Sequence, residues 1–176
     1  MTFADVGEAA GYSRGLPAAI FGTKDNLIVQ AAKRITEVPV TQTLFNTEPA
    51  DSVAEMIDVI EHWFELISLG AEEVRGMLVL LSVGMISETA KRFPELLDVL
   101  QSIDGTVRTR FETFLENGKA RGELRPEIDI KVESILILGS IRGIFWQWLI
   151  APEAYDLVKV GRYFTGQLRD RLQLRT

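Results

Sequence analysis

The most informative segment of the chain is residues 11–27, which read GYSRGLPAAIFGTKDNL. The glycines at positions 11 and 22 are typical of two turns, with a short helix between them and a longer helix starting at Lys24. Residues 2–10 predict a further short helix, because Thr2 and Asp5 have the form of a capping box. Two short helices joined by a glycine-containing turn are typical of a helix-turn-helix, whose second helix enters the DNA major groove.

Single residues predict where these helices begin and end. We expect Ser13 to cap the second helix, which would start at Arg14 and carry Pro17 just inside its first turn. Thr23 is expected to cap the long helix, and Pro39 to end or kink it, with a further segment running to about residue 46.

The rest of the chain predicts helices joined by short connections and no strand, since no segment shows sustained period-2 alternation. Capping residues and prolines place the helix starts near Ser52, Pro94, Asp129 and Pro152. The predicted helices cover residues 52–69, 72–91, 94 to 118 or 122, 129–150 and 152–174.

Residues 2–27 resemble the recognition region of the TetR family of bacterial transcriptional regulators. The matching motifs are Ala9-Ala10-Gly11, Ser13-Arg14-Gly15 and Phe21-Gly22-Thr23-Lys24-Asp25 with Leu27. The resemblance implies an all-α fold: a partial helix-turn-helix unit at residues 1–33, then a dimeric ligand-binding and dimerisation bundle at residues 34–176. It also implies contacts with double-stranded operator DNA through Thr2, Ser13, Arg14, Gly15, Leu16, Ala18, Ala19, Thr23 and Lys24.

The family's DNA-binding domain has three helices, and its first helix precedes the helix-turn-helix. Here the chain opens on the second helix, so the resemblance implies an N-terminally incomplete unit. We expect a loosened or rearranged DNA-binding unit, because four residues would lose a packing partner: Phe3, Val6, Ile20 and Phe21. The alternative function is therefore a dimeric helical small-molecule binding protein whose truncated DNA-binding unit is not functional.

Bulk composition limits the function further. The chain has 176 residues, 47% of them hydrophobic, no cysteine and a net charge of −6. Residues 1–35 carry four basic and three acidic groups, a net charge of +1, against −7 for the remainder. This asymmetry permits DNA contact at the N-terminal end, but a charge of +1 is small for a phosphate-binding surface. The sequence shows no signal peptide, membrane span or metal-ligand pattern, so we expect a cytoplasmic protein without a cofactor.

One motif points to an enzyme. Gly11-Tyr12-Ser13-Arg14-Gly15 matches the nucleophile elbow of α/β-hydrolases, but that motif follows a strand, and the residues before it here predict a helix. The single histidine, His62, has no acid partner that the sequence can place. We therefore expect no enzymatic activity.

Aromatic and methionine side chains recur on several predicted helices and could enclose an apolar effector. The resemblance implies that small, hydrophobic effectors bind in this region, and Arg142 is a candidate for contact with an effector carboxylate. The ligand-binding candidates are Trp63, Phe64, Met77, Met85, Phe111, Phe114, Arg142, Phe145 and Trp146.

Residues 132–150 are apolar almost all round, which indicates a helix that buries more than one face. The resemblance implies that the last two helices pair with their copies in a homodimer. The candidates for this interface are Ile135, Gly139, Gly143, Trp148, Tyr155, Gly161, Phe164 and Leu168. The sequence thus predicts a dimeric regulator, a repressor released from DNA by its effector.

Overall fold

The computed structural model describes residues 2–35, 37, 52–69, 76 and 94–173, and it is helical throughout these ranges apart from the turns and loops that connect the helices. An isolated bridge pairs Leu124 with Gln173. The helices are α1 (Phe3–Ala9), α2 (Leu16–Phe21), α3 (Lys24–Ile35), α5 (Val53–Leu69), α8 (Pro94–Ala120), α9 (Ile130–Ile150) and α10 (Leu157–Leu172), with a short 3-10 turn, η1, at Pro152–Ala154. The all-α prediction is therefore confirmed.

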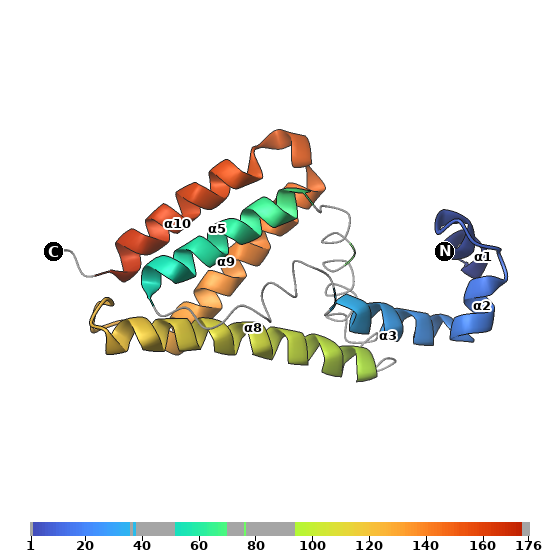
Figure 1. Ribbon diagram of the computed structural model, residues 1–176, viewed down its shortest axis with the longest axis horizontal. Helices are drawn as coiled ribbons and strands as arrows, with labels where there is room; N and C mark the ends of the chain where they lie inside the picture. Colours follow the sequence, from blue (N-terminus) through green and yellow to red (C-terminus); the bar gives the residue numbers. More distant parts are fainter. Residues whose placement is uncertain (1, 36, 38–51, 70–75, 77–93, 174–176) are drawn as a thin grey trace.

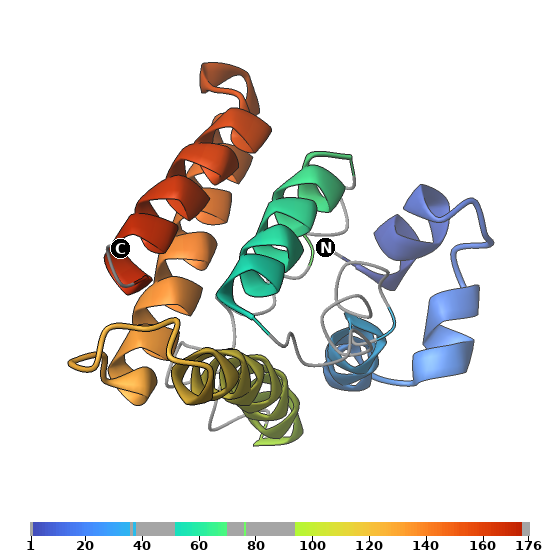
Figure 2. The ribbon, with the colours of Figure 1, turned by 60° about the vertical axis from the view of Figure 1, so that its left-hand side comes forward.

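The molecule has two ends (Figure 1). Helices α1 and α2 lie at one end, and α3 leads from them toward a bundle in which α5, α9 and α10 run alongside one another. Helix α8 crosses this bundle, packs on α9 and α5, and also reaches α3 (Figure 2). The 27-residue α8 thus contacts both the bundle and α3, so it connects the bundle to the N-terminal part of the structure.

Most predicted caps at the N-terminal end are present. The Thr2 hydroxyl accepts from the Asp5 amide at 3.2 Å, and the Asp5 carboxylate accepts from the Thr2 amide. Hydrogen bonding of the Asp5 carboxylate to Thr2, to its backbone amide above all, lowers the pKa of Asp5. Gly11 and Gly22 take φ angles of 74° and 68°, as turns after α1 and α2 require. The Thr23 hydroxyl accepts from the Asn26 amide at 3.1 Å and caps α3.

The prediction that Ser13 caps the second helix is wrong. Helix α2 begins at Leu16, and its N-cap is Gly15, which has no side chain to offer. The Ser13 carbonyl accepts from the Leu16 amide in a turn before the helix, because this carbonyl is held against Gly7 of α1. Pro17 does lie in the first turn, as predicted.

The predicted start of the last helix is also wrong. Pro152–Ala154 form the separate turn η1, and Tyr155 follows in an extended conformation with its hydroxyl donating to the Ile144 carbonyl at 3.0 Å. This extended residue interrupts the helix, so α10 starts at Leu157. Its N-cap is Asp156, whose carboxylate accepts a hydrogen bond from the Lys159 amide. The segments predicted near residue 46 and at 72–91, with Pro39, lie outside the described residues, apart from the helical Gly76.

The loop between α8 and α9 ties the bundle together at one end. The Val53 amide at the start of α5 donates to Glu123 Oε2 at 2.8 Å. Arg125 donates to the carbonyl oxygens of Asp170 and Gln173 at the end of α10, where a cation is favoured by the helix dipole. One loop thus caps two helices that it does not adjoin in sequence.

The core of the bundle consists of apolar side chains from α5, α8, α9 and α10. Helices α5 and α10 approach closely at Gly161 of α10, because a Cβ atom there would lie 2.7 Å from Phe64 Cδ1 of α5. Thr165 of α10 donates to the Glu61 carboxylate of α5 at 2.6 Å. Glu133 of α9 is buried and pairs with Arg171 of α10. Burial raises the pKa of the Glu133 carboxyl, while Arg171 acts in the opposite direction.

A second, smaller apolar cluster joins α3 to α8. Val29 and Ala32 of α3 are buried against Leu96 and Leu100 of α8. The predicted domain boundary after residue 33 falls inside α3, which runs on to Ile35. The division into residues 1–33 and 34–176 stays a prediction.

Candidate functional site

The N-terminal helices form a tight helix-turn-helix. Gly7 is buried, and a Cβ atom there would lie 2.6 Å from the Ser13 carbonyl oxygen. The Tyr12 amide donates to the Gly7 carbonyl at 2.8 Å, so the turn folds back onto α1. Helix α1, and not a strand, precedes Ser13, which removes the structural context that a nucleophile elbow needs.

Most of the predicted DNA contacts lie on the surface of this unit. The Thr2 and Thr23 hydroxyls accept from amides of their own helices, whereas the side chains at the turn before α2 project from the fold. Leu16 is half-buried. The exposed candidates are Thr2, Ser13, Arg14, Gly15, Ala18, Ala19, Thr23 and Lys24.

The basic residues of this unit differ in their ionic partners. Arg14 contacts Glu8 of α1, with Nη2 and Oε2 separated by 3.0 Å. Lys33 lies 3.9 Å from Glu95, and Arg34 pairs with Glu37. Lys24, at the first position of α3, forms no ion pair among the described residues, but its charge helps to lower the pKa of the Asp5 carboxyl. Lys24 therefore presents a positive charge beside the amino end of a helix, where anions are favoured.

The structure brings five of the aromatic ligand candidates together in the core. Trp63 and Phe64 of α5, Phe111 and Phe114 of α8 and Phe145 of α9 are all buried. Edge-to-face contacts join Trp63 to Phe111 and Phe64 to Phe145, with ring centroids 6.0 and 4.9 Å apart. Met77 and Met85 lie outside the described residues.

The indole nitrogen of Trp63 is an exception within this core. Trp63 is 3% exposed, and its Nε1 has no hydrogen-bond partner among the described residues. A buried donor without a partner costs about 1–3 kcal/mol, so such atoms are rare in native cores. This nitrogen is a polar atom of the aromatic cluster that an incoming acceptor could satisfy.

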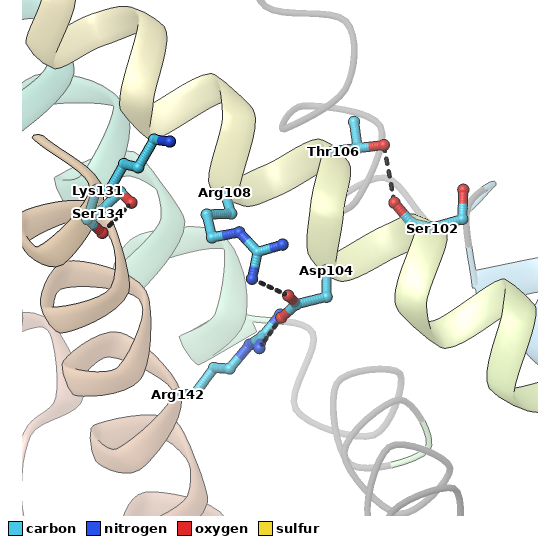
Figure 3. Close-up of polar contacts among 7 residues, drawn as sticks. All are labelled: Ser102, Asp104, Thr106, Arg108, Lys131, Ser134 and Arg142. Atoms are coloured by element: carbon cyan, nitrogen blue, oxygen red, sulfur yellow. Dashed lines mark hydrogen bonds and ion pairs between the residues drawn. The ribbon is translucent and has the colours of Figure 1, made fainter. Parts of the chain in front are cut away.

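Arg142 is engaged in an ionic cluster between α8 and α9 (Figure 3). Its Nη1 lies 2.5 Å from Asp104 Oδ1, and Arg108 Nη1 lies 3.2 Å from the other carboxylate oxygen of Asp104. Figure 3 shows both guanidinium groups directed at this one carboxylate. An effector carboxylate that uses Arg142 would have to compete with Asp104. Asp104 was not among the residues that the sequence pattern singled out.

One face of α9 is apolar and exposed. Ile135 belongs to it, and Gly139 and Gly143 lie within it, where a Cβ atom on either glycine would meet no other atom within 4 Å. Most members follow alternating steps of four and three residues, the spacing of a seam between paired helices. We call this surface the α9 stripe; it consists of Val132, Ile135, Leu136, Gly139, Gly143, Trp146 and Ile150.

The other interface candidates face inward. Trp148, Gly161 and Leu168 are buried within the protomer, and Phe164 is half-buried against Phe64 with ring centroids 6.3 Å apart. Tyr155 is half-buried and held by Ile144. Trp146, a ligand candidate, lies instead on the α9 stripe. Val132, Leu136 and Ile150 were not among the interface candidates, although their heptad spacing was visible in the sequence.

None of the described helices combines the length and the apolar character that a membrane crossing requires. Within the same residues, no three acidic, histidine or cysteine side chains gather as a metal site would need.

Comparison with solved structures identifies the same fold in known regulators. NalD of Pseudomonas aeruginosa, the secondary repressor of the MexAB-OprM multidrug efflux pump, is 18% identical over 100% of this chain and 88% of NalD, with a TM-score of 0.72. SmeT of Stenotrophomonas maltophilia in complex with triclosan is 23% identical over 96% of this chain and 81% of SmeT (TM-score 0.69). FadR of Bacillus subtilis with stearoyl-CoA is 16% identical over 96% of this chain and 87% of FadR (TM-score 0.71).

Among curated proteins, none matches the chain by sequence. A protein-family model does match: it describes the C-terminal region of MAATS-type transcriptional repressors within the TetR family, and it covers residues 85–173, just over half of the chain. The matched residues include the whole of α8, α9 and α10. The protein therefore belongs to the MAATS-type transcriptional repressors of the TetR family.

Proposed function

We propose that this repressor binds operator DNA as a homodimer through α1, α2 and the start of α3, and that a small hydrophobic effector releases it. The observation that carries the proposal is the tight helix-turn-helix at the N-terminal end. It holds Arg14 and Lys24 on the surface, at the turn before α2 and at the start of α3. Base edges are read by such guanidinium groups, and phosphates by such ammonium groups.

The α9 stripe supports the dimer. A helix that is apolar on both sides needs a second partner, and α9 already buries its inner face against α8 and the core. In a two-fold dimer each stripe faces its own copy, and glycines at the centre let the two helices approach closely. A two-fold arrangement also presents two DNA-binding units to two half-sites.

The aromatic core supports the effector. The related regulators SmeT and FadR are solved with triclosan and stearoyl-CoA, each of which has a large apolar part: the chlorinated rings of triclosan and the fatty acyl chain of stearoyl-CoA. We propose that an effector of this class enters beside Trp63 and accepts a hydrogen bond from its Nε1. The effector must bind the DNA-incompetent state better than the DNA-bound state to cause release.

Removing the two surface cations is expected to weaken DNA binding in different ways. The target is a duplex selected in vitro by the wild-type chain, and fluorescence anisotropy measures the affinity. Arg14→Gln should lower affinity for this duplex by about tenfold or more, because a bidentate base contact is worth about 1–3 kcal/mol. Lys24→Gln should weaken selected and random duplexes alike, and it should reduce the salt slope by about 0.9 for each phosphate that is no longer neutralised.

The control for this experiment is Lys119→Gln. It makes the same charge change at an exposed position near the end of α8 that lies far from α1 and α2 (Figure 1). If the wild-type chain selects no sequence while it still binds effector as a dimer, the chain is a ligand-binding protein with a non-functional DNA-binding unit.

Trp63→Phe is expected to weaken effector binding without unfolding the protein. Triclosan serves as the probe, and calorimetry measures its Kd. The variant keeps an aromatic ring against Phe111 but loses the donor, so affinity should fall by about tenfold, the value of one hydrogen bond of about 1.4 kcal/mol. Trp148→Phe, at another buried tryptophan, should leave the Kd within about twofold. Equal losses in both variants would refute the assignment of Trp63.

A further inference from the structure

The contact between Arg14 and Glu8 lies inside the proposed DNA-reading surface. Glu8 belongs to α1, and Arg14 lies in the turn that leads to α2. The Arg14 Nη2 atom donates to Glu8 Oε2 at 3.0 Å. The side chains are 75% and 66% exposed, respectively, so the contact is open to solvent and to any ligand that approaches this face.

The other acidic groups of the N-terminal unit have different positions. Asp5 accepts hydrogen bonds in the capping box with Thr2, and Asp25 lies in the first turn of α3. Lys24 has no ion pair within the described part of the chain. Glu8 is therefore the carboxylate whose contact with Arg14 the structure shows, and it makes no such contact with Lys24, whose charge acts on the Asp5 carboxylate.

This arrangement affects two kinds of DNA binding differently. Non-specific binding depends on the number of free cations that can replace counterions on the phosphates, and a paired Arg14 adds little to that number. A guanidinium group has five N–H donors, and Glu8 accepts from one nitrogen atom. The remaining donors can still form a bidentate contact with a base edge in the major groove.

We infer that Glu8 restrains Arg14 and is a specificity-determining residue of the DNA interface: it suppresses binding to DNA in general and spares the contact that reads sequence. The inference rests on the proposed DNA-binding function. It assigns Glu8 a positioning role that acts through Arg14, without a contact of its own to the bases.

The test is a double-mutant cycle with Glu8→Gln, Arg14→Gln and the combined variant. Each chain is titrated by fluorescence anisotropy against a duplex selected by the wild-type chain and against a random-sequence duplex of the same length, over a range of salt concentrations. Circular dichroism of each variant checks that the helical content is unchanged. Glutamine has no charge, but its side chain is polar and similar in length to the side chain that it replaces.

We expect Glu8→Gln to tighten binding to the random duplex by about fivefold or more and to steepen its salt slope by about 0.9 for each protomer. Affinity for the selected duplex should change by less than about twofold, so the specificity ratio falls. In the Arg14→Gln background, Glu8→Gln should have no further effect on either duplex.

Two results would overturn the inference while the proposed function stands. One is an equal gain on both duplexes, which leaves the specificity ratio unchanged. The other is a gain of the same size in the Arg14→Gln background, which would mean that Glu8 repels DNA directly. A wild-type chain that binds neither duplex would overturn both the inference and the proposed function.

Discussion

Replacing Gly161 by alanine should lower the midpoint of thermal unfolding by about 6–12 °C, the shift that corresponds to about 3 kcal/mol in a chain of this size. The new methyl group would lie 2.7 Å from Phe64 Cδ1 and 2.8 Å from Phe64 Cβ, so it would overlap the part of the Phe64 side chain next to the backbone. Phe64 is fully buried and packs on Phe145 and Phe164, so its ring has little freedom to move aside.

Gly166→Ala is the matched control for this variant. Gly166 lies further along the same helix, and nothing lies within 4 Å of the position of its new methyl group. Alanine should therefore stabilise α10 there by up to about 1 kcal/mol through its higher helix propensity. Differential scanning calorimetry distinguishes the two outcomes. Similar shifts in both variants would show that α10 does not pack closely on α5 at Gly161.

Replacing Leu136 by aspartate should convert the proposed dimer to monomers. Leu136 is 46% exposed in the protomer and belongs to the α9 stripe. A two-fold interface would contain the substitution twice, and each buried carboxylate without a partner costs several kcal/mol. The dimer dissociation constant should rise by at least about 100-fold, which sedimentation equilibrium can measure.

The control places the same charge elsewhere on the surface. Leu69, at the end of α5, is 86% exposed and lies off the stripe, so Leu69→Asp should leave the dissociation constant unchanged within about threefold. A Leu136→Asp chain that still sediments as a dimer would exclude the α9 stripe as the interface. The Leu136→Asp variant should also lose selected-duplex affinity if two half-sites are read together.

The capping predictions that succeeded depend on local chemistry. Thr2, Thr23 and Asp129 each accept from amides two or three residues further on, and such contacts are encoded in a few neighbouring residues. Ser13 failed as a cap because a contact with another helix, the close approach of Gly7, holds its carbonyl in a turn. Pro152 failed because Tyr155 is tied to Ile144 of the preceding helix.

The interface residues were harder to predict than the helices. In α9 both the inner and the outer face are apolar, so periodicity alone does not separate Trp148, which is buried, from Trp146, which is exposed. Gly161 was a candidate for the dimer interface. Within the protomer it allows close packing on Phe64 of α5. Ion pairs such as Glu8–Arg14 and Asp104–Arg142 depend on side-chain geometry that the sequence does not specify.

The length of α8 has a mechanical consequence. Asp104 joins α8 to α9, and Leu96, about two turns away along α8, supports the apolar contact with α3. The separation is about 12 Å at about 1.5 Å per residue, so a rotation of about 10° around Asp104 would move Leu96 by about 2 Å. In such a rotation α8 would act as a lever with its pivot at the ionic cluster. In the proposed dimer, equal rotations in the two protomers would change the distance between the DNA-binding units and so convert a small displacement near the core into a mismatch with the pitch of the double helix.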